Sequence, residues 1–479
     1  MRVLIALHRW WGVVFCLLFA AWFASGIVMH FVPFPARGEA DRFAGLVAID
    51  REKVVHGPAE AVAASGAQDA LRVRLVGRSD GPVYLIAGSS GLRALRADDL
   101  RDARLGSDRT PLDIAAVYAR SRGLDASRIR IATLASYDQW TVSGDYDADR
   151  PLYRIALEDA AGTELHVSSA SGAVVSVTTQ KARALNYIGS IVHWIYPTAL
   201  RQHRQLWGAL MWWLSLLGTI GAGAGVAIGL IRLCTAHRRT APAYRGLQGW
   251  HYRLGLVFAP FLLCWIFSGF LSMDNGLLFS RGVSRAEAQA VAGAPAWDRL
   301  SPDELQHLPA DAKEIEWFAF AGQIYRRDRE GPERQLLIEI APALDAAPVQ
   351  RAFLTQDQID LATKRLGADC GLASAVGADD AYRTRPATAD HPVFRIVCGD
   401  IWFDVDGATG EVSNRLDPSR RAYRWLFSGL HTLDFAWLKH PPWLRSTLIV
   451  VLCGFGFAFS LSGVVLAWRR LRNTAAGTD

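Results

Sequence analysis

The chain has 479 residues, of which 51% are hydrophobic and 10% aromatic, and its formal net charge is +6. It contains four apolar runs without charged residues, each long enough to cross a hydrocarbon layer of roughly 30 Å as a helix. These runs exclude an ordinary soluble protein. Arginines flank the runs, so the net charge mostly indicates membrane topology, and no basic stripe on an external segment suggests nucleic acid as a partner.

The apolar runs predict transmembrane helices, surrounded by membrane lipid, and their orientation. They cover residues 10–32, about 207–231, about 254–273 and about 446–468. Arginines precede the first run, fill the connection between the second and third, and follow the fourth. Because short basic loops stay in the cytoplasm, we expect both termini to lie there. The first run is too long for the apolar part of a cleaved signal peptide, so we expect it to remain as a helix.

The sequence also repeats itself at two offsets. An offset of 243 residues relates three pairs: His8 and His251, Trp22 and Trp265, and Ser25-Gly26 and Ser268-Gly269. An offset of 238 residues relates three more: His193 and His431, Gly225 and Gly463, and Arg232 and Arg470. Each half therefore reads as helix, external domain, amphipathic segment and helix. Since both halves begin and end in the cytoplasm, the repeat is parallel, with a pseudo-two-fold axis along the membrane normal.

Alternating apolar and polar residues predict β-hairpins in the external segments. The expected strand pairs are 73–76 with 83–86, 152–158 with 164–167, 315–320 with 324–326, and 394–397 with 401–405. Helical periodicity is found at residues 111–122 and 356–366, so both external domains are expected to be α+β. Cys370 and Cys398 fall in the second domain. An oxidising compartment would allow them to form a disulfide, but the sequence leaves this open.

The expected fold class is an α-helical membrane protein with four transmembrane helices in two parallel repeats and two α+β external domains. The expected boundaries are 1–32 for the cytoplasmic N-terminus and first helix, 33–182 for the first external domain, 183–235 for an amphipathic segment and the second helix, 236–273 for the cytoplasmic loop and third helix, 274–420 for the second external domain, and 421–479 for a second amphipathic segment, the fourth helix and the cytoplasmic tail.

Four of the twelve histidines occupy matched positions in the two halves. His8 and His251 lie at the cytoplasmic ends of helices, whereas His193 and His431 lie just before helices, on the external side. A haem iron takes two axial ligands, which two histidines related by the pseudo-symmetry can supply. The pattern therefore predicts one haem site near each face. The alternative is that each histidine is an interfacial anchor.

Three further residues are secondary candidates. His30 lies about six helical turns, or ~33 Å, after His8, and Met273 holds the equivalent position in the other half. Either is a possible alternative external ligand. His203 precedes the second helix and is a candidate ligand, propionate partner or substrate contact.

Glycine-rich sequence in the second helix does not indicate a nucleotide site. Gly221, Gly223 and Gly225 lie inside an apolar run, without the strand and acidic residue that a dinucleotide fold requires. Gly218, Gly221, Gly225 and Gly229 form a stripe of small residues, which suits close helix packing and would also let a flat macrocycle approach. No flavin or nicotinamide site is indicated, so electrons would have to enter from another protein or a membrane carrier.

These motifs resemble a known family. The segments LHRWWG and WHYRLG, each followed by W and SG, are similar to PepSY-associated transmembrane proteins, as are SASGAVVSV, DGATGEVSN, IVHWIYP and GLHTLDF. The family includes siderophore reductases of the bacterial inner membrane that hold haem b in the helix bundle. The resemblance implies PepSY-like periplasmic domains, haem b at about two sites, and His8, His251, His193 and His431 as ligands. It also implies a ferric siderophore or other ferric chelate as substrate, with a quinone or cytoplasmic reductase as electron donor.

Two functions remain open from the sequence. One is a transmembrane haem-b oxidoreductase that reduces a periplasmic ferric complex. The other is a membrane-anchored PepSY module for peptidase inhibition or sensing, without redox activity. A transporter is disfavoured, because the apolar runs contain almost no ionisable residue near their centres.

Overall fold

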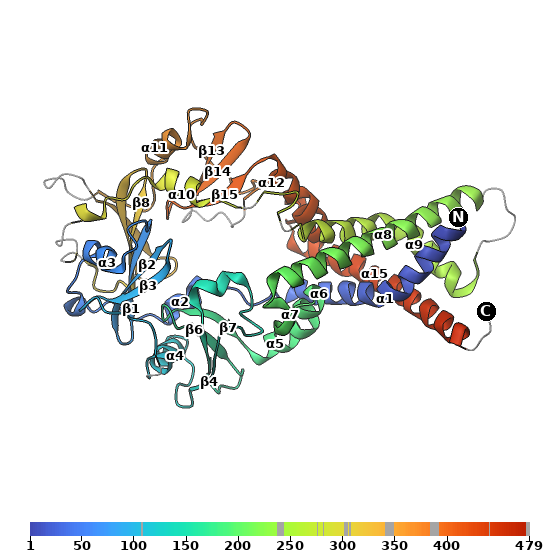
Figure 1. Cartoon of the computed structure of the whole chain (residues 1–479), viewed down its shortest axis with the longest axis horizontal. Coiled ribbons are helices and arrows are strands. Elements are labelled where there is room, and N and C mark those ends of the chain that lie inside the picture. The colour runs from blue at the N-terminus through green and yellow to red at the C-terminus, as the bar shows by residue number, and fades with distance from the viewer. Residues whose placement is uncertain are drawn as a thin grey trace. The chain divides into compact units, whose positions relative to one another are not determined.

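The computed structural model describes residues 1–106, 109–236, 244–274, 276–280, 282–300, 305, 308–340, 349–383, 392–439 and 441–475. The chain folds into two compact units (Figure 1). A helical unit comprises Met1–Phe34, Lys181–Ser280 and Ser419–Asp479, and a sheet unit comprises Pro35–Gln180 and Arg281–Pro418. Part of the expected basic connection, residues 237–243, lies outside the described residues.

Four long helices build the helical unit: α1 (Arg2–Phe31), α8 (Arg204–Ala236), α9 (Gly246–Ser272) and α15 (Pro442–Ala475). Among the described residues, α1, α8 and α15 are long and apolar enough to cross a membrane. Helix α1 packs most extensively against α15, and α8 against α9. Apolar side chains of α1, α8, α9 and α15 share one core cluster between the helices.

Helix α9, which contains the third predicted apolar run, is bent. Its parts Gly246–Phe258 and Pro260–Ser272 are bent by 67° relative to each other. Pro260 has no N–H, and its ring clashes with the carbonyl four residues earlier, so it interrupts the helical hydrogen bonds. The two parts count as a fourth candidate span only if they are taken together.

Two similar sets of short elements precede α8 and α15. The first set is α5 (Gln180–Asn186), η3 (Tyr187–Ile191), α6 (Val192–Trp194) and α7 (Thr198–Arg201); the second is α12 (Pro418–Tyr423), η6 (Arg424–Gly429), α13 (Leu430–Thr432) and α14 (Ala436–Lys439). Elements η3 and η6 are π-helical. The chain leaves α6 and α13 through left-handed residues, Ile195 (φ 46°) and Leu433 (φ 51°), which are again 238 residues apart.

A seven-stranded antiparallel sheet forms the centre of the sheet unit. Its strand order is β11 (Val349–Arg351), β10 (Gln335–Glu339), β9 (Gln323–Arg329), β8 (Glu314–Phe320), β1 (Arg72–Arg78), β2 (Gly81–Gly88) and β3 (Gly91–Arg96). Strands β1 and β8 come from different external segments and pair with Leu75 opposite Ile315. The two external segments therefore share one sheet, which the hairpin patterns did not reveal.

Two four-stranded sheets, one in each external segment, complete the sheet unit. The first contains β4 (Arg130–Ala135), β5 (Leu152–Ala156), β6 (Glu164–Ser168) and β7 (Val174–Thr178); the second contains β12 (Ser374–Ala375), β13 (Val393–Cys398), β14 (Ile401–Asp406) and β15 (Val412–Leu416). Buried residues of α4 (Thr110–Ser121) share a core with the first sheet, and buried residues of α11 (Gln356–Leu366) share one with the second.

All four sequence-predicted hairpins are present. In the first, Val73 lies opposite Ile86 and Val76 opposite Val83, as the alternation predicted. The other three are β5–β6, β8–β9 and β13–β14. Cys370 and Cys398 form a disulfide, which resolves the alternative that the sequence left open.

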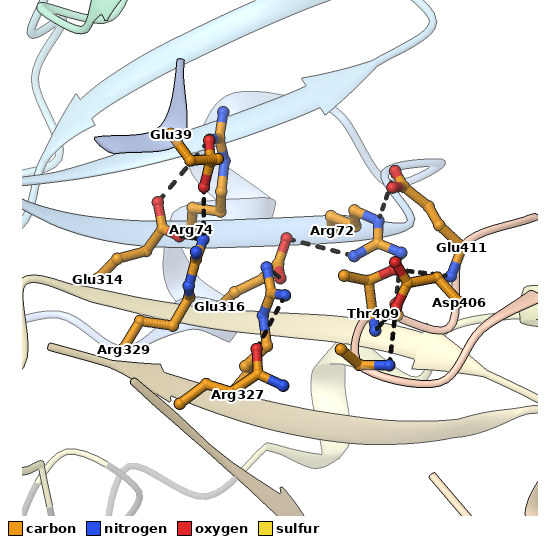
Figure 2. A network of polar contacts seen from close by, with 12 residues as sticks. Glu39, Arg72, Arg74, Glu314, Glu316, Arg327, Arg329, Asp406, Thr409 and Glu411 are labelled. Atoms are coloured by element: carbon orange, nitrogen blue, oxygen red, sulfur yellow. Dashed lines mark hydrogen bonds and ion pairs between the residues drawn. The ribbon is translucent and has the colours of Figure 1, made fainter. Parts of the chain in front are cut away.

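Buried charges join β1, β8 and β9 across the seam between the two external segments (Figure 2). Glu314 of β8 is fully buried, and its carboxylate lies 3.0 Å from Arg329 of β9 and 2.5 Å from Arg42. Glu316, the next residue on the same face, lies 2.6 Å from Arg327 of β9 and 3.3 Å from Arg72 of β1. Each carboxylate thus ties strands of the second external segment to residues of the first.

These ion pairs control the protonation of the buried carboxylates. Burial alone would raise the pKa of Glu314, but the guanidinium groups of Arg42, Arg74 and Arg329 outweigh burial and lower it. The pKa of Glu39 is similarly lowered to about 2, with Arg42 and Arg329 overcoming its burial. Removing one partner from such a network leaves uncompensated buried charge, which is strongly destabilising.

We expect the substitution Glu314→Gln to destabilise the sheet unit by about 3–5 kcal/mol, because Arg42 and Arg329 would lose their buried counter-charge. Hydrogen exchange of the β1 and β8 amides in the full chain measures this loss. Glu52→Gln, at an exposed position, is the matched control and should change stability by less than about 0.5 kcal/mol. Wild-type protection in the Glu314 variant would contradict the role assigned to the network.

The network also predicts how stability depends on pH. The folded-state pKa of Glu39 and of Glu314 lies below the ordinary glutamate value. Their stabilising contribution is therefore present above the unfolded-state pKa of about 4.3 and is lost as the pH falls through the folded-state values. The stability of the sheet unit, measured as its unfolding midpoint, should decrease as the pH is lowered below about 5. This decrease with pH should be less steep in Glu314→Gln. Equal slopes in the two proteins would argue against this assignment.

Candidate cofactor site in the helical unit

The rings of His193 of α6 and His431 of α13 lie in edge-on contact, with ring centroids 6.3 Å apart and ring planes at 69°. His193 Nδ1 lies 3.1 Å from the Trp22 carbonyl oxygen and 3.1 Å from Ser25 Oγ, both on α1. His431 Nδ1 makes the same two contacts on α9, at 3.1 Å from the Trp265 carbonyl oxygen and 3.1 Å from Ser268 Oγ. The same two contacts thus occur in both halves. The two histidines are 238 positions apart, and the tryptophans and serines that they contact are 243 positions apart.

The backbone on both sides of these histidines is unusual in the same way. A π-helical turn precedes each one, and a left-handed residue follows two positions later. Single π-helical turns occur frequently at functional sites. Both imidazoles lie against a glycine of the long helix. A Cβ on Gly269 would lie only 3.2 Å from His431 Cε1, whereas a Cβ on Gly26 would lie 3.6 Å from His193 Cε1, an ordinary contact distance.

His8 of α1 and His251 of α9 line one cavity of about 510 Å³ in the helical unit. His8 Nδ1 lies 3.4 Å from the Gly221 carbonyl oxygen, and His251 Nδ1 lies 2.7 Å from Ser462 Oγ. Phe459 stacks on His251 with ring centroids 4.5 Å apart. A cavity of this size lies within the range of roughly 300–1,000 Å³ that binds small organic ligands.

The glycine stripe of α8 provides the space for rings from α1. A Cβ on Gly225 would lie 2.6 Å from His8 Cε1, and a Cβ on Gly221 would lie 2.3 Å from Trp11. Trp11 Nε1 also donates to the Leu217 carbonyl at 2.7 Å. The stripe therefore serves close packing of α1 on α8, with His8 held against it.

All four matched histidines use Nδ1 for their hydrogen bonds. Backbone carbonyls can only accept, and Ser25, Ser268 and Ser462 already donate to helix carbonyls, so each Nδ1 carries the proton. In the described part of the chain, no hydrogen bond involves Nε2 of these four residues. A proton on Nδ1 leaves the Nε2 lone pair as the one that binds a metal.

The pair formed by His193 and His431 also has a suitable separation. A metal–imidazole bond is roughly 2 Å long, which places the centroids of two imidazoles on opposite sides of one metal ~6 Å apart. The observed centroid distance is 6.3 Å. Among the described residues, no group of three or more His, Cys, Asp or Glu is arranged around a metal ion. A haem iron needs only two protein ligands, and the matched histidines fit that requirement.

The secondary candidates are placed differently. His30 contacts Ser446 Oγ through Nε2 at 2.9 Å, whereas the other four histidines make their hydrogen bonds with described residues through Nδ1. His203 is exposed and lies 3.5 Å from the Gln202 side chain. Met273 is half-buried at the end of α9, where its N–H donates to the Phe270 carbonyl. The structure thus groups the four matched histidines in pairs and leaves these three outside the pairs.

The sequence did not assign roles to the three serines that accept from the histidines. Ser25 and Ser268 were visible only as markers of the repeat, 17 residues after His8 and His251. Each of these two serines lies three residues after a tryptophan, Trp22 or Trp265, whose carbonyl oxygen accepts a hydrogen bond from the same histidine Nδ1. This spacing is the signal that connects Ser25 to His193 and Ser268 to His431.

Comparison with known proteins supports the resemblance. No curated protein matches this chain. The family model described as the PepSY-associated TM region matches residues 5–470. Because this match covers nearly the whole sequence, the protein is a membrane protein and belongs to the PepSY-associated transmembrane family.

Proposed function

We propose that this protein is a haem-b oxidoreductase of the bacterial inner membrane that passes electrons to a periplasmic ferric complex such as a ferric siderophore. The observation that carries the proposal is the pairing of His193 with His431. Their rings are 6.3 Å apart, and both Nδ1 atoms are oriented by equivalent carbonyls. A structural or anchoring role would not require the Nε2 atom of both residues to be left for a ligand.

The proposal includes the topology expected from the sequence. The helices α1, α8, α9 and α15 form four spans in two parallel repeats, with the bent helix α9 counted as one span. Both termini are cytoplasmic, and residues 33–182 and 274–420 form two PepSY-like periplasmic domains that share the central seven-stranded sheet. The disulfide between Cys370 and Cys398 supports this assignment, because disulfides persist in the periplasm and are rare in the cytosol.

In this function the chain holds and orients two redox groups. His193 and His431 would hold one haem, and His8 and His251 the other; a bound haem supplies one-electron chemistry. Ser25, Ser268, Ser462 and the backbone carbonyls fix the imidazole rings, which makes the Nε2 atoms better ligands. One electron from the membrane or cytoplasmic side, supplied by a quinol or a reductase, would convert Fe(III) in the external chelate to Fe(II).

The detergent-purified protein should show a b-type absorbance spectrum, with about two haems per chain, one for each histidine pair. His431→Ala should remove about half of this haem, because a single axial histidine remains at the outer pair. His203→Ala, at an exposed position, is the control and should keep the full content. Pyridine haemochrome quantitation provides the measurement, and a colourless wild-type protein after expression with ample haem would overturn the proposal.

A second experiment separates the reductase from a membrane-anchored binding module. The protein, reduced with dithionite without oxygen and freed of excess reductant, should be reoxidised by a ferric hydroxamate chelate. The gallium(III) form of the same chelate has the same charge and cannot accept the electron, so it should leave the haem spectrum unchanged. A binding or regulatory module would show the same response to both chelates, and that result would exclude ferric reduction.

A further inference from the structure

Two arginines occupy equivalent positions beside the cavity of His8 and His251. Arg232 of α8 and Arg470 of α15 are 238 residues apart, and each follows a glycine by seven residues. The glycines are Gly225 and Gly463, where a Cβ would lie 2.6 Å from His8 Cε1 and 3.6 Å from His251 Cε1. Seven residues are about two helical turns, so each arginine extends from the face of its glycine, ~10 Å further along the axis.

Each guanidinium group lies beside one aromatic ring. Arg470 lines the cavity and lies 5.6 Å from the centroid of the Trp10 ring. Arg232 lies 5.8 Å from the ring of Tyr244, which lines the same cavity. The cavity therefore has a cationic end and an aromatic rim, whereas its deeper walls include apolar residues such as Leu262 and Leu263.

One donor of each arginine has no partner among the described residues. The Nε atoms of Arg232 and Arg470 are buried and make no hydrogen bond with that part of the chain. In the part of the chain that the structure describes, neither guanidinium forms an ion pair with a carboxylate. Leaving a buried charged donor without a partner is unfavourable, so both residues are suited to an anionic group that the polypeptide does not supply.

We propose that Arg232 and Arg470 bind the carboxylates of the molecule that occupies this cavity, and that they orient a haem by its two propionates. This inference rests on the proposed function. A guanidinium binds a carboxylate through two parallel hydrogen bonds, and two matched guanidiniums suit a ligand with two carboxylates at one edge. The apolar walls suit the remainder of a flat macrocycle.

Phospholipid phosphate is the other anionic oxygen group available at a membrane surface. Arg469, the neighbour of Arg470, is exposed and represents that situation, because an exposed arginine at a helix end reaches lipid headgroups. The cavity, the unpartnered Nε atoms and the matched positions distinguish Arg232 and Arg470 from it. We therefore assign the cavity's occupant, and not lipid, to these two residues.

The test is a potentiometric titration of the haems in the full-length protein. The wild type is compared with the variants Arg232→Gln and Arg470→Gln and with the control variant Arg469→Gln. The inner haem is the one lost in His8→Ala. Removing a positive charge beside the inner haem should reduce its ratio of reduced to oxidised haem, at a fixed potential, by about tenfold. The outer haem should titrate as in the wild type. Resonance Raman bands of the propionates should shift in the same two variants and not in Arg469→Gln.

Substitution by lysine keeps the charge, so Arg470→Lys should recover most of the wild-type ratio. Loss of the inner haem in Arg470→Gln, with the outer haem retained and with recovery by lysine, also supports the assignment. A wild-type inner haem in both glutamine variants would overturn it, as would an equal shift in Arg469→Gln. These results differ from failure of the proposed function, in which the wild-type protein would contain no haem.

Discussion

The hydrogen bond from a histidine Nδ1 to a tryptophan carbonyl organises the helical unit. It occurs between His193 and Trp22, and again between His431 and Trp265. In an apolar environment a polar side chain must find its partners within the protein, and a helix carbonyl is one of the few acceptors there. The bond attaches each short segment before α8 or α15 to a long helix and sets the tautomer of the imidazole. The π-helical turns, the left-handed residues and the glycines beside the rings are all consistent with this one contact.

The sequence predicted local features of the fold well. Strand alternation located the four hairpins, and the helix at residues 356–366 has the bounds that its periodicity indicated. The matched histidines emerged from the two offsets, because a ligand position that both halves retain is visible as a repeat. His30 was a weaker candidate. Its helix position was correct, but helical periodicity alone does not reveal that its Nε2 contacts Ser446, more than 400 residues away.

Long-range pairing was beyond the reach of sequence patterns. Nothing near β1 indicates that it pairs with β8, since alternation specifies which face a residue occupies and not which strand lies beside it. Hydropathy does not reveal that Glu314 of β8 and Arg329 of β9 are both buried, because Arg42, which pairs with Glu314, lies 272 residues away in the sequence. Pro260 is a sequence signal for the bend in α9. The long apolar run around it indicated a single membrane-spanning helix, so the bend was not predicted.

The shared central sheet has a consequence for biosynthesis. Strand β1 has β2 on one side and β8 on the other. The ribosome therefore completes β1 long before its second neighbour exists. With the proposed topology, α8 and α9 must enter the membrane and the second external segment must be exported before β8 arrives. During that interval β1 is an open edge with unpaired N–H and C=O groups, a surface prone to pairing with other chains. Maturation of this protein thus has a vulnerable stage, and a chain that stops after α8 would remain in it.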